Sequence, residues 1–330
     1  MRKLIGLTCT FLIVCLVGGL ALGAQNPPPQ VRSTDKPFLW RIEGTVPSYL
    51  YGTIHVPDPR VLELPEVVRR AMDVSDVFNA EIPLDAGTQM GMLSKIMLPQ
   101  GEDLRKIAGD EVFARLVGAI TKALSIKLPP GAADILASTL APMKPWAAMS
   151  QVELLEFLPD MMAGRQPLDA MLYGMATTAG KDVGGLETVD EQVGVFEAFT
   201  IEEQVRMLKA SLDDLDKPRP GGVSPTRQLV NLYLAGDLGP LAGELNDQYP
   251  DDPALKKKMV ARVIDDRNVS LSGRIAALCA KRPAKSYFFA VGALHYAGDT
   301  GILTQLTKKG FKITRLGPAD AASIVRKPAA

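Results

Sequence analysis

The run that most constrains the fold is a continuous apolar segment at residues 286–292, which contains aromatic and β-branched side chains and ends in glycine. A short run of this kind, with no polar alternation, predicts a strand that is buried on both faces. Such a strand belongs to a sheet that helices cover on both sides. At 330 residues and 47% hydrophobic composition, the chain has enough apolar material for a large core.

Segments of strand composition recur along the chain. The pair 38–42 and 48–54 predicts an opening hairpin, and further strands are expected at residues 76–82, 181–186 and 311–316. Helical spacing fills two long blocks, at about 86–179 and 201–280. We expect an α/β fold with a central, mostly parallel or mixed sheet, flanked by helices and carrying these two blocks as large helical insertions.

Three capping-box patterns predict helix starts. They pair Ser150 with Glu153, Thr188 with Glu191, and Thr200 with Glu203. The second pair places Glu187 at a junction between a strand and a helix.

The N-terminus has the pattern of an export signal. Arg2 and Lys3 precede 21 uncharged residues, 4–24, that end in small side chains. We expect a signal peptide at 1–24 and a periplasmic or secreted protein. Because about 20 apolar residues can span a bilayer, an uncleaved inner-membrane anchor at 4–24 is the alternative and the only expected membrane contact. A Pro-rich linker at 25–36, one domain at 37–320 and a tail at 321–330 complete the prediction.

The charge and the cysteine content argue against several functions and features of the protein. With 37 basic and 37 acidic residues the formal net charge is zero, which disfavours nucleic-acid binding. Of three cysteines, Cys9 and Cys15 lie in the leader, so no intramolecular disulfide can form in the mature chain. Cys279 lies in an apolar helical stretch and is predicted to be a core thiol rather than a nucleophile.

The chain contains two histidines, and both occur in the same motif. Gly52 precedes His55, and Gly292 precedes His295, by three positions at the end of an apolar strand. Ligands of open α/β sheets bind beyond the carboxyl ends of the strands. An imidazole is a common proton carrier and metal ligand. The repeated motif predicts that the two rings share one functional site, although a histidine on an apolar strand is also often a purely structural residue.

A catalytic metal ion usually has three protein ligands and one open position, so two histidines need a carboxylate. Glu81 lies at the end of the predicted strand 76–82, and Glu187 follows the predicted strand 181–186, so both would face the same crevice if those strands are neighbours. The alternatives are that Glu187 stabilises a helix N-terminus and that Glu81 is a solvated strand-end charge.

These motifs, together with Leu39-Trp40, Leu64-Pro65 and Asp266-Arg267-Asn268, resemble the TraB/GumN family, which includes the Tiki metalloproteases. The resemblance implies a sheet-centred fold like that of the erythromycin esterase and haem-binding relatives. It also implies a divalent metal, manganese or cobalt with zinc as an alternative, and hydrolysis of a peptide or protein substrate. His55 and His295 would be metal ligands or catalytic, and Glu81 and Glu187 the accompanying acids. Arg267 and Asn268 would hold a carbonyl or stabilise an oxyanion.

Three functions follow as hypotheses. The first is an exported metal-dependent hydrolase, in which one glutamate is a metal ligand and the other moves the proton. The second is an envelope protein that binds metal or haem in the same cleft without turnover. The third is a periplasmic interaction protein that uses its helical insertion to contact a partner.

Overall fold

The computed structural model describes residues 34–124, 130–217, 222–246 and 252–326. The predicted signal peptide and most of the linker lie outside these ranges. Within them, no helix is both long enough and apolar enough to cross a membrane.

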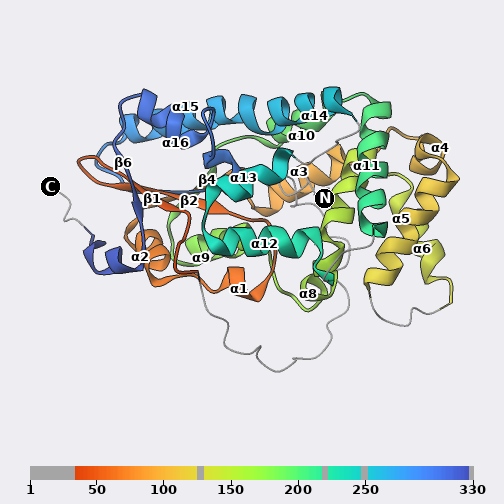
Figure 1. The fold of residues 1–330 in the computed structure, drawn as a ribbon, viewed down its shortest axis with the longest axis horizontal. Helices are drawn as coiled ribbons and strands as arrows, with labels where there is room; N and C mark the ends of the chain where they lie inside the picture. Colours follow the sequence, from red (N-terminus) through yellow and green to blue (C-terminus); the bar gives the residue numbers. More distant parts are fainter. Residues whose placement is uncertain (1–33, 125–129, 218–221, 247–251, 327–330) are drawn as a thin grey trace.

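A six-stranded mixed sheet lies in one half of the protein, and helices form the other half (Figure 1). Its strands run in the order β4-β3-β5-β2-β1-β6. The first four of these are mutually parallel, and β1 and β6 complete the sheet in antiparallel pairing. The predicted α/β class with a mixed sheet is confirmed. The bounds are β1 (Leu39–Ile42), β2 (Ser48–Thr53), β3 (Val77–Ala80), β4 (Asp182–Gly185), β5 (Tyr287–Gly292) and β6 (Ile313–Leu316).

The central strand β5 is the apolar run from which the fold was predicted, and all six of its residues are buried. Its alternating side chains pack on opposite faces of the sheet. On one face Phe288 stacks on Phe78 of β3, with 5.9 Å between ring centroids. On the other, Tyr287 and Phe289 stack on each other at 5.4 Å. Helices cover both faces, with α15 and α16 on one side and α2 and α9 on the other (Figure 1).

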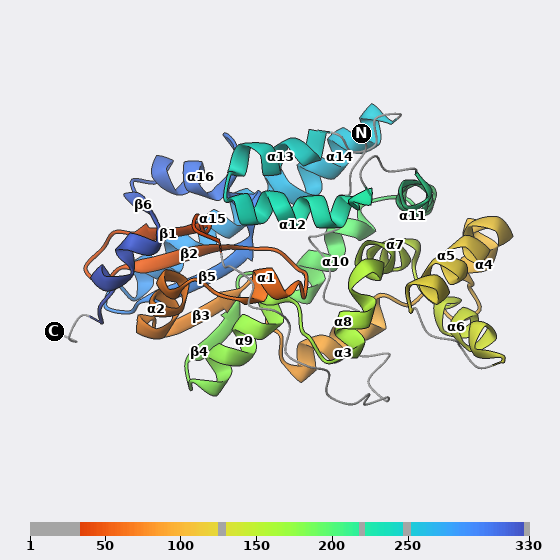
Figure 2. The ribbon, with the colours of Figure 1, turned by 60° about the horizontal axis from the view of Figure 1, so that its bottom comes forward.

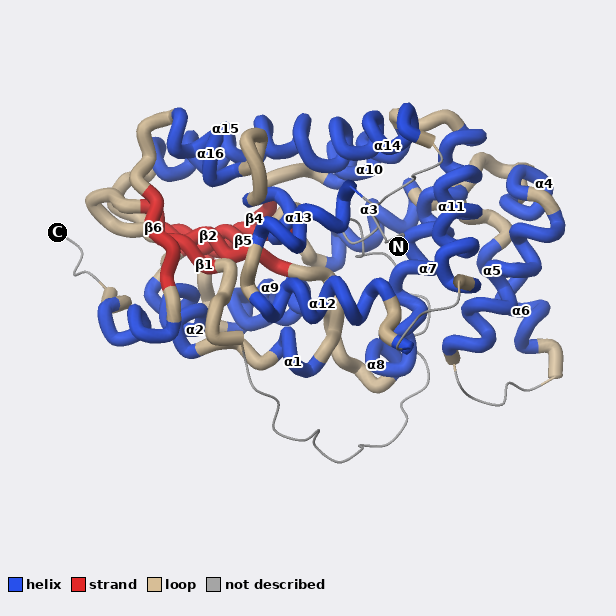
Figure 3. Tube along the Cα trace, viewed as in Figure 1, coloured by secondary structure: helices blue, strands red, loops and turns tan. Residues whose placement is uncertain are grey.

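Helices fill both predicted insertions (Figure 3). Before the first insertion come α1 (Pro59–Leu62) and α2 (Glu66–Val74), and after β5 comes α16 (Ile302–Lys308). The first insertion, between β3 and β4, holds α3 (Ala86–Lys95), α4 (Leu104–Ala108), α5 (Asp110–Ala123), α6 (Ala132–Leu140), α7 (Pro145–Leu154), α8 (Leu158–Met162) and α9 (Leu168–Thr178). The second, between β4 and β5, holds α10 (Val189–Glu197), α11 (Ile201–Asp216), α12 (Pro225–Ala235), α13 (Leu238–Asn246), α14 (Pro253–Met259) and α15 (Asp266–Lys281).

The two insertions lie differently against the sheet. Figure 2 shows α4, α5 and α6 far from the strands, whereas α9, α12 and α15 lie close to them. At the C-terminus, the short turn Pro318–Ser323 packs against α2, and Ile324 is buried. The chain therefore stays packed on the domain at least to residue 324.

Two of the three predicted capping boxes are confirmed. The side chains of Thr188 and Thr200 cap α10 and α11 reciprocally with Glu191 and Glu203. The prediction for Ser150 is wrong, because α7 already begins at Pro145 and Ser150 lies inside it, donating to the Trp146 carbonyl. Proline at the first helical position starts the helix earlier than the capping pattern suggested.

The parallel strands determine where the site lies. Because β2, β3, β4 and β5 run in the same direction, their carboxyl ends meet at one edge of the sheet. Each of these strands is followed within three residues by one predicted site residue: His55 after β2, Glu81 after β3, Glu187 after β4 and His295 after β5. In space the order along this edge is Glu187, Glu81, His295, His55.

Candidate active site

A buried arginine joins the two predicted carboxylates. Arg267, in the first turn of α15, donates from Nη2 to Glu81 Oε2 at 2.5 Å and to Glu187 Oε2 at 2.6 Å. Its Nε also donates to Glu187 Oε1 at 3.1 Å. All three side chains are at most 6% exposed. The two carboxylates therefore share one crevice, as the sequence predicted for neighbouring strands.

The two carboxylates differ in their environments. Glu81 also accepts from the Gly292 N–H at 2.7 Å and from Gln192 Nε2 at 3.2 Å. Burial raises the pKa of Glu81, but Arg267, the two histidines and the Gly292 N–H outweigh it and lower this pKa to about 2. For Glu187, burial prevails over Arg267, so its pKa is raised. Glu81 is thus the permanent anion, and Glu187 is the carboxyl that takes up a proton more readily.

His55 is oriented from behind by an aspartate. Asp169, in the first turn of α9, lies with Oδ2 2.6 Å from His55 Nδ1, and its Oδ1 accepts from Thr53 Oγ1 at 2.6 Å. Burial lowers the pKa of His55. The charge and hydrogen bond of Asp169 and the charge of Glu81 together raise this pKa by more than burial lowers it, so the net shift is upward. The opposite nitrogen, Nε2, lies 3.8 Å from Glu81 Oε1. It is buried and has no hydrogen-bond partner among the described residues.

His295 is oriented by the residue next to Arg267. Its Nδ1 lies 2.7 Å from Asn268 Oδ1, and its Nε2 lies 3.1 Å from Arg267 Nη1. An amide oxygen accepts and a guanidinium donates, so Nδ1 carries the proton and Nε2 is the acceptor. Burial and the Arg267 charge lower the pKa of His295 to about 3, which keeps the ring neutral.

The donors converge on the space beside Gly292. A Cβ atom at this position would lie 3.2 Å from Glu81 Oε1, 3.5 Å from His295 Cδ2 and 3.7 Å from His55 Nε2. Glycine therefore keeps open the point that both rings and Glu81 surround. A divalent ion could take the unpartnered His55 Nε2 and the ionised Glu81 as ligands in this open space. Within the described ranges, no three His, Cys, Asp or Glu side chains are arranged as a metal site. Arg267 contacts His295 Nε2 and both glutamates.

Sequence reasoning found the four strand-end residues but missed their partners. Asp169, Thr53 and Gln192 were not predicted as site residues. Thr53 lies inside the first Gly-x-x-His motif and Gln192 directly follows the Thr188–Glu191 capping box, whereas no motif marks Asp169. Arg267 and Asn268 were expected to act on the substrate. In the structure their side chains hold Glu81, Glu187 and His295, and their role toward a carbonyl or oxyanion stays a prediction.

The fold and this edge of the sheet define an α/β protein with a buried centre of two histidines, two glutamates and an arginine. The TraB/PrgY/gumN family model matches residues 38–315, and the chain belongs to that family. The resemblance found in the sequence is confirmed.

The curated relatives of this chain are named metalloproteases. Metalloprotease TIKI1 of Danio rerio is 27% identical in an alignment that covers 92% of this chain and 69% of the relative. Metalloprotease TIKI2 of Danio rerio is 27% identical, covering 90% and 66%. Metalloprotease TIKI1 of Homo sapiens is 27% identical, covering 91% and 67%. The chain thus spans about two thirds of the length of these relatives. No solved structure matches the chain significantly.

If His55 ligates a metal, replacing Asp169 by asparagine is expected to lower the metal affinity or turnover 10- to 100-fold, which is the usual effect of removing a carboxylate behind a ligating histidine. The amide lacks the charge that orients and polarises His55. Titration against a chelator of known affinity measures the change. Asp160→Asn is the matched control, because Asp160 forms a surface ion pair with Arg165. Equal affinities for the two variants would rule out an orienting role for Asp169.

The stability of the protein is expected to fall in acid. The pKa of Glu81 drops from 4.5 in the unfolded chain to about 2 in the fold, so its contribution is complete above pH 4.5 and is lost as the pH falls toward 2. The loss is on the order of 3 kcal/mol. His295, with its pKa lowered from 6.5 to about 3, acts in the same direction.

Urea unfolding at several values between pH 4.5 and 2 measures this loss of stability. Glu81→Gln removes the titrating group and should flatten the curve. An equally steep curve for that variant would assign the acid sensitivity to other carboxyls.

Proposed function

We propose that the chain is an exported metal-dependent protease whose centre is the His55–Glu81–His295 edge of the sheet. The observation that carries the proposal is the buried, unpartnered His55 Nε2, which lies 3.8 Å from an ionised carboxylate oxygen of Glu81. A buried nitrogen acceptor without a partner is costly unless a ligand satisfies it. The relatives named metalloproteases support a metal as that ligand and a protein as the substrate.

Some of these residues would bind the metal, and others orient the residues that bind it. His55, His295 and Glu81 would hold the metal, and a divalent ion so held would activate water and polarise the scissile carbonyl. Asp169 and Asn268 fix the rings so that each presents its Nε2. Glu187, whose pKa is raised, would be the group that takes the proton from the attacking water and returns it to the leaving amine.

Arg267 has two effects on such a centre. It neutralises part of the negative charge of Glu81 and Glu187, which keeps both buried carboxylates in place. It also engages His295 Nε2 and Glu81 Oε2, so both of these contacts would have to open for His295 and Glu81 to hold a metal. The export signal predicted at residues 1–24 agrees with a substrate outside the cytoplasm, in the periplasm or beyond.

The proposal is tested with protein isolated from the periplasm. Metal content is measured by mass spectrometry, and cleavage of a peptide library is followed before and after chelation and after reloading with manganese, cobalt or zinc. We expect one divalent ion per chain, loss of cleavage on chelation and recovery with one of these ions. Retention of full cleavage after complete metal removal would contradict the proposal.

The same preparation separates the rival hypotheses. A haem Soret band after reconstitution, with no cleavage of any library peptide, would identify a binding protein without turnover. Stoichiometric metal without cleavage would lead to the same class. A partner captured by a variant that lacks both histidines, and lost on deletion of the first helical insertion, would identify an interaction protein.

A further inference from the structure

Positive charge is concentrated in the last part of the chain. Residues 267–319 contain nine basic side chains and a single acid, Asp299, although the whole chain is formally neutral. Three of the nine are engaged: Arg267 in the buried centre, Arg274 in a surface ion pair, and Arg315 by backbone carbonyls. The other six are exposed, and we call them the basic end: Lys281, Arg282, Lys285, Lys308, Lys309 and Lys312.

The basic end lies at the edge of the sheet opposite the candidate centre. Strand β6 is antiparallel to β1, which is antiparallel to β2, so β6 runs in the same direction as β5. Helices α15 and α16 precede these two strands and lie side by side (Figure 1). Their C-terminal turns, and the loops that follow them, therefore meet at the edge where β5 and β6 begin. The candidate centre lies beyond the other ends of the strands.

The acidic side chains at this edge are engaged by other groups. Asp76 is held by a backbone N–H and by an arginine near the C-terminus, and Glu43 pairs with an arginine of β1. Lys285 acts on Asp76 by its charge without pairing with it. Among the described residues, the only ion pair of the basic end joins Arg282 and Asp182 at 3.9 Å. The positive charge of the six side chains is therefore largely uncompensated.

A structural role explains only part of this cluster. Basic side chains in the last turn of a helix stabilise that end through the helix dipole, which accounts for Lys281 and Lys308. Lys285 and Lys312 lie outside the helices, in the loops before β5 and β6. Like charges gathered on one end repel one another. An anionic partner would turn this repulsion into attraction.

Three features favour a lipid surface over a nucleic acid as that partner. Five of the six side chains are lysines, whose ammonium groups act as point charges rather than as bidentate forks for single phosphates. The exposed large hydrophobic side chains of the described residues include no aromatic ring on which bases could stack. The export signal predicted at residues 1–24 would bring the chain to a membrane.

We propose that the basic end docks on the surface of an anionic phospholipid bilayer. Clusters of about four to eight basic residues are attracted to such surfaces, over a distance of about one Debye length. In this orientation the candidate centre faces away from the bilayer. The leader is then not the only part of the chain that contacts a membrane. The proposal does not depend on whether the centre cleaves peptides.

Binding to vesicles tests the proposal. The full chain, as isolated from cells, is sedimented with phosphatidylcholine vesicles that either contain or lack phosphatidylglycerol. An uncleaved leader would bind both kinds of vesicle, so the difference between them is the measured quantity. We expect stronger binding to the anionic vesicles at about 0.1 M salt, and loss of the difference at about 1 M, where the screening length falls from about 10 Å to about 3 Å. Equal binding to both kinds at low salt would overturn the proposal.

Charge variants locate the binding surface. Replacing Lys281, Lys285 and Lys309 together by glutamine should weaken binding to the anionic vesicles on the order of 100-fold, since each basic residue at the surface contributes about fivefold. The matched control makes the same replacement at three exposed lysines of the helical insertions: Lys106, Lys209 and Lys257. This control loses the same charge away from the basic end and should bind nearly as the wild type does. Equal loss in the two triple variants would overturn the proposal.

Acetylation of lysines in the unchanged protein reports its orientation. With anionic vesicles present, the five lysines of the basic end should react more slowly with an acetylating reagent than they do without vesicles. The three control lysines should react at the same rate in both conditions. Mass spectrometry of the digested protein measures each site. Protection of the control lysines, with no protection of the basic end, would place the bilayer on another surface and contradict the proposal.

Discussion

His55→Ala is expected to lower peptide cleavage by a factor of 1,000 or more and to abolish stoichiometric metal binding. The ring supplies the unpartnered Nε2, and the described residues offer no other imidazole except His295 with which to replace it. His295→Ala should have the same direction of effect. Losses of this size are typical when a residue that acts directly on the reaction is removed.

Folding has to be kept apart from catalysis in this test. Unfolding curves of both variants should show a folded protein, because an alanine in place of a ring leaves the strand ends β2 and β5 intact. Cys279→Ala is the control variant that should keep its activity. Burial raises the pKa of this half-buried thiol, which makes it a poor nucleophile, so this variant should keep full activity. Full metal content in His55→Ala would show that the ligand assignment is wrong.

Arg267→Met is expected to destabilise the protein by about 3 to 5 kcal/mol, because it leaves two buried carboxylates without their cation. Glu81 would keep the Gly292 N–H and Gln192, but the charge that lowers its pKa to about 2 would be gone. Urea unfolding at pH 7 measures the loss. The pH dependence of unfolding should also change, because Glu81 would then protonate at a higher pH.

A second arginine on the same helix provides the matched control. Arg274 lies two turns further along α15 and pairs with Glu191 at the surface, where the two side chains are 37% and 43% exposed. An exposed pair contributes about 1 kcal/mol or less, so Arg274→Met should be nearly neutral. If the two substitutions cost the same, the buried ion pair does not stabilise the site.

The strand-end residues were predictable because their signals are local. Each copy of the Gly-x-x-His motif lies within a few residues of the strand that it ends, β2 or β5, and backbone geometry carries such a local pattern directly into structure. The same holds for Glu81 and Glu187, each of which follows a short strand. Once the strands are parallel, their carboxyl ends must meet at one edge.

Local sequence patterns gave a wrong or missing prediction where a neighbouring helix start or the packing of a distant helix determined the structure. Ser150 and Glu153 have the spacing of a capping box, but Pro145 starts α7 earlier and buries both residues inside the helix. Asp169 has no motif at all, since it contacts His55 from a position 114 residues away. Its role depends on how α9 packs against the sheet.

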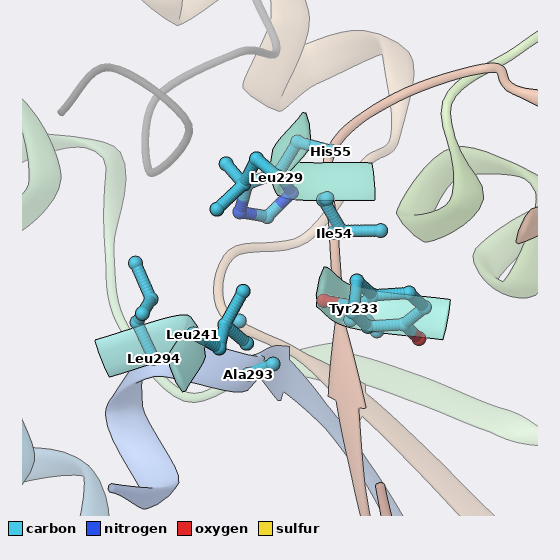
Figure 4. A pocket seen from close by; sticks show the side chains of 9 residues that line it. Ile54, His55, Leu229, Tyr233, Leu241, Ala293 and Leu294 are labelled. Carbon is cyan, nitrogen blue, oxygen red and sulfur yellow. The ribbon is translucent and has the colours of Figure 1, made fainter. Parts of the chain in front are cut away.

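The sequence by itself determined the class of fold, the two histidine motifs and the edge of the sheet at which the site lies, because these depend on periodicity and strand direction. Only the tertiary structure decided that Arg267 lies between two carboxylates that come from positions 186 and 80 residues before it. The same is true of the apolar contacts beside His55, where Leu229 and Leu241 of the second insertion meet Ile54 and Leu294 (Figure 4). Contacts between such distant segments are set by the packing of whole helices, and no short pattern encodes that packing.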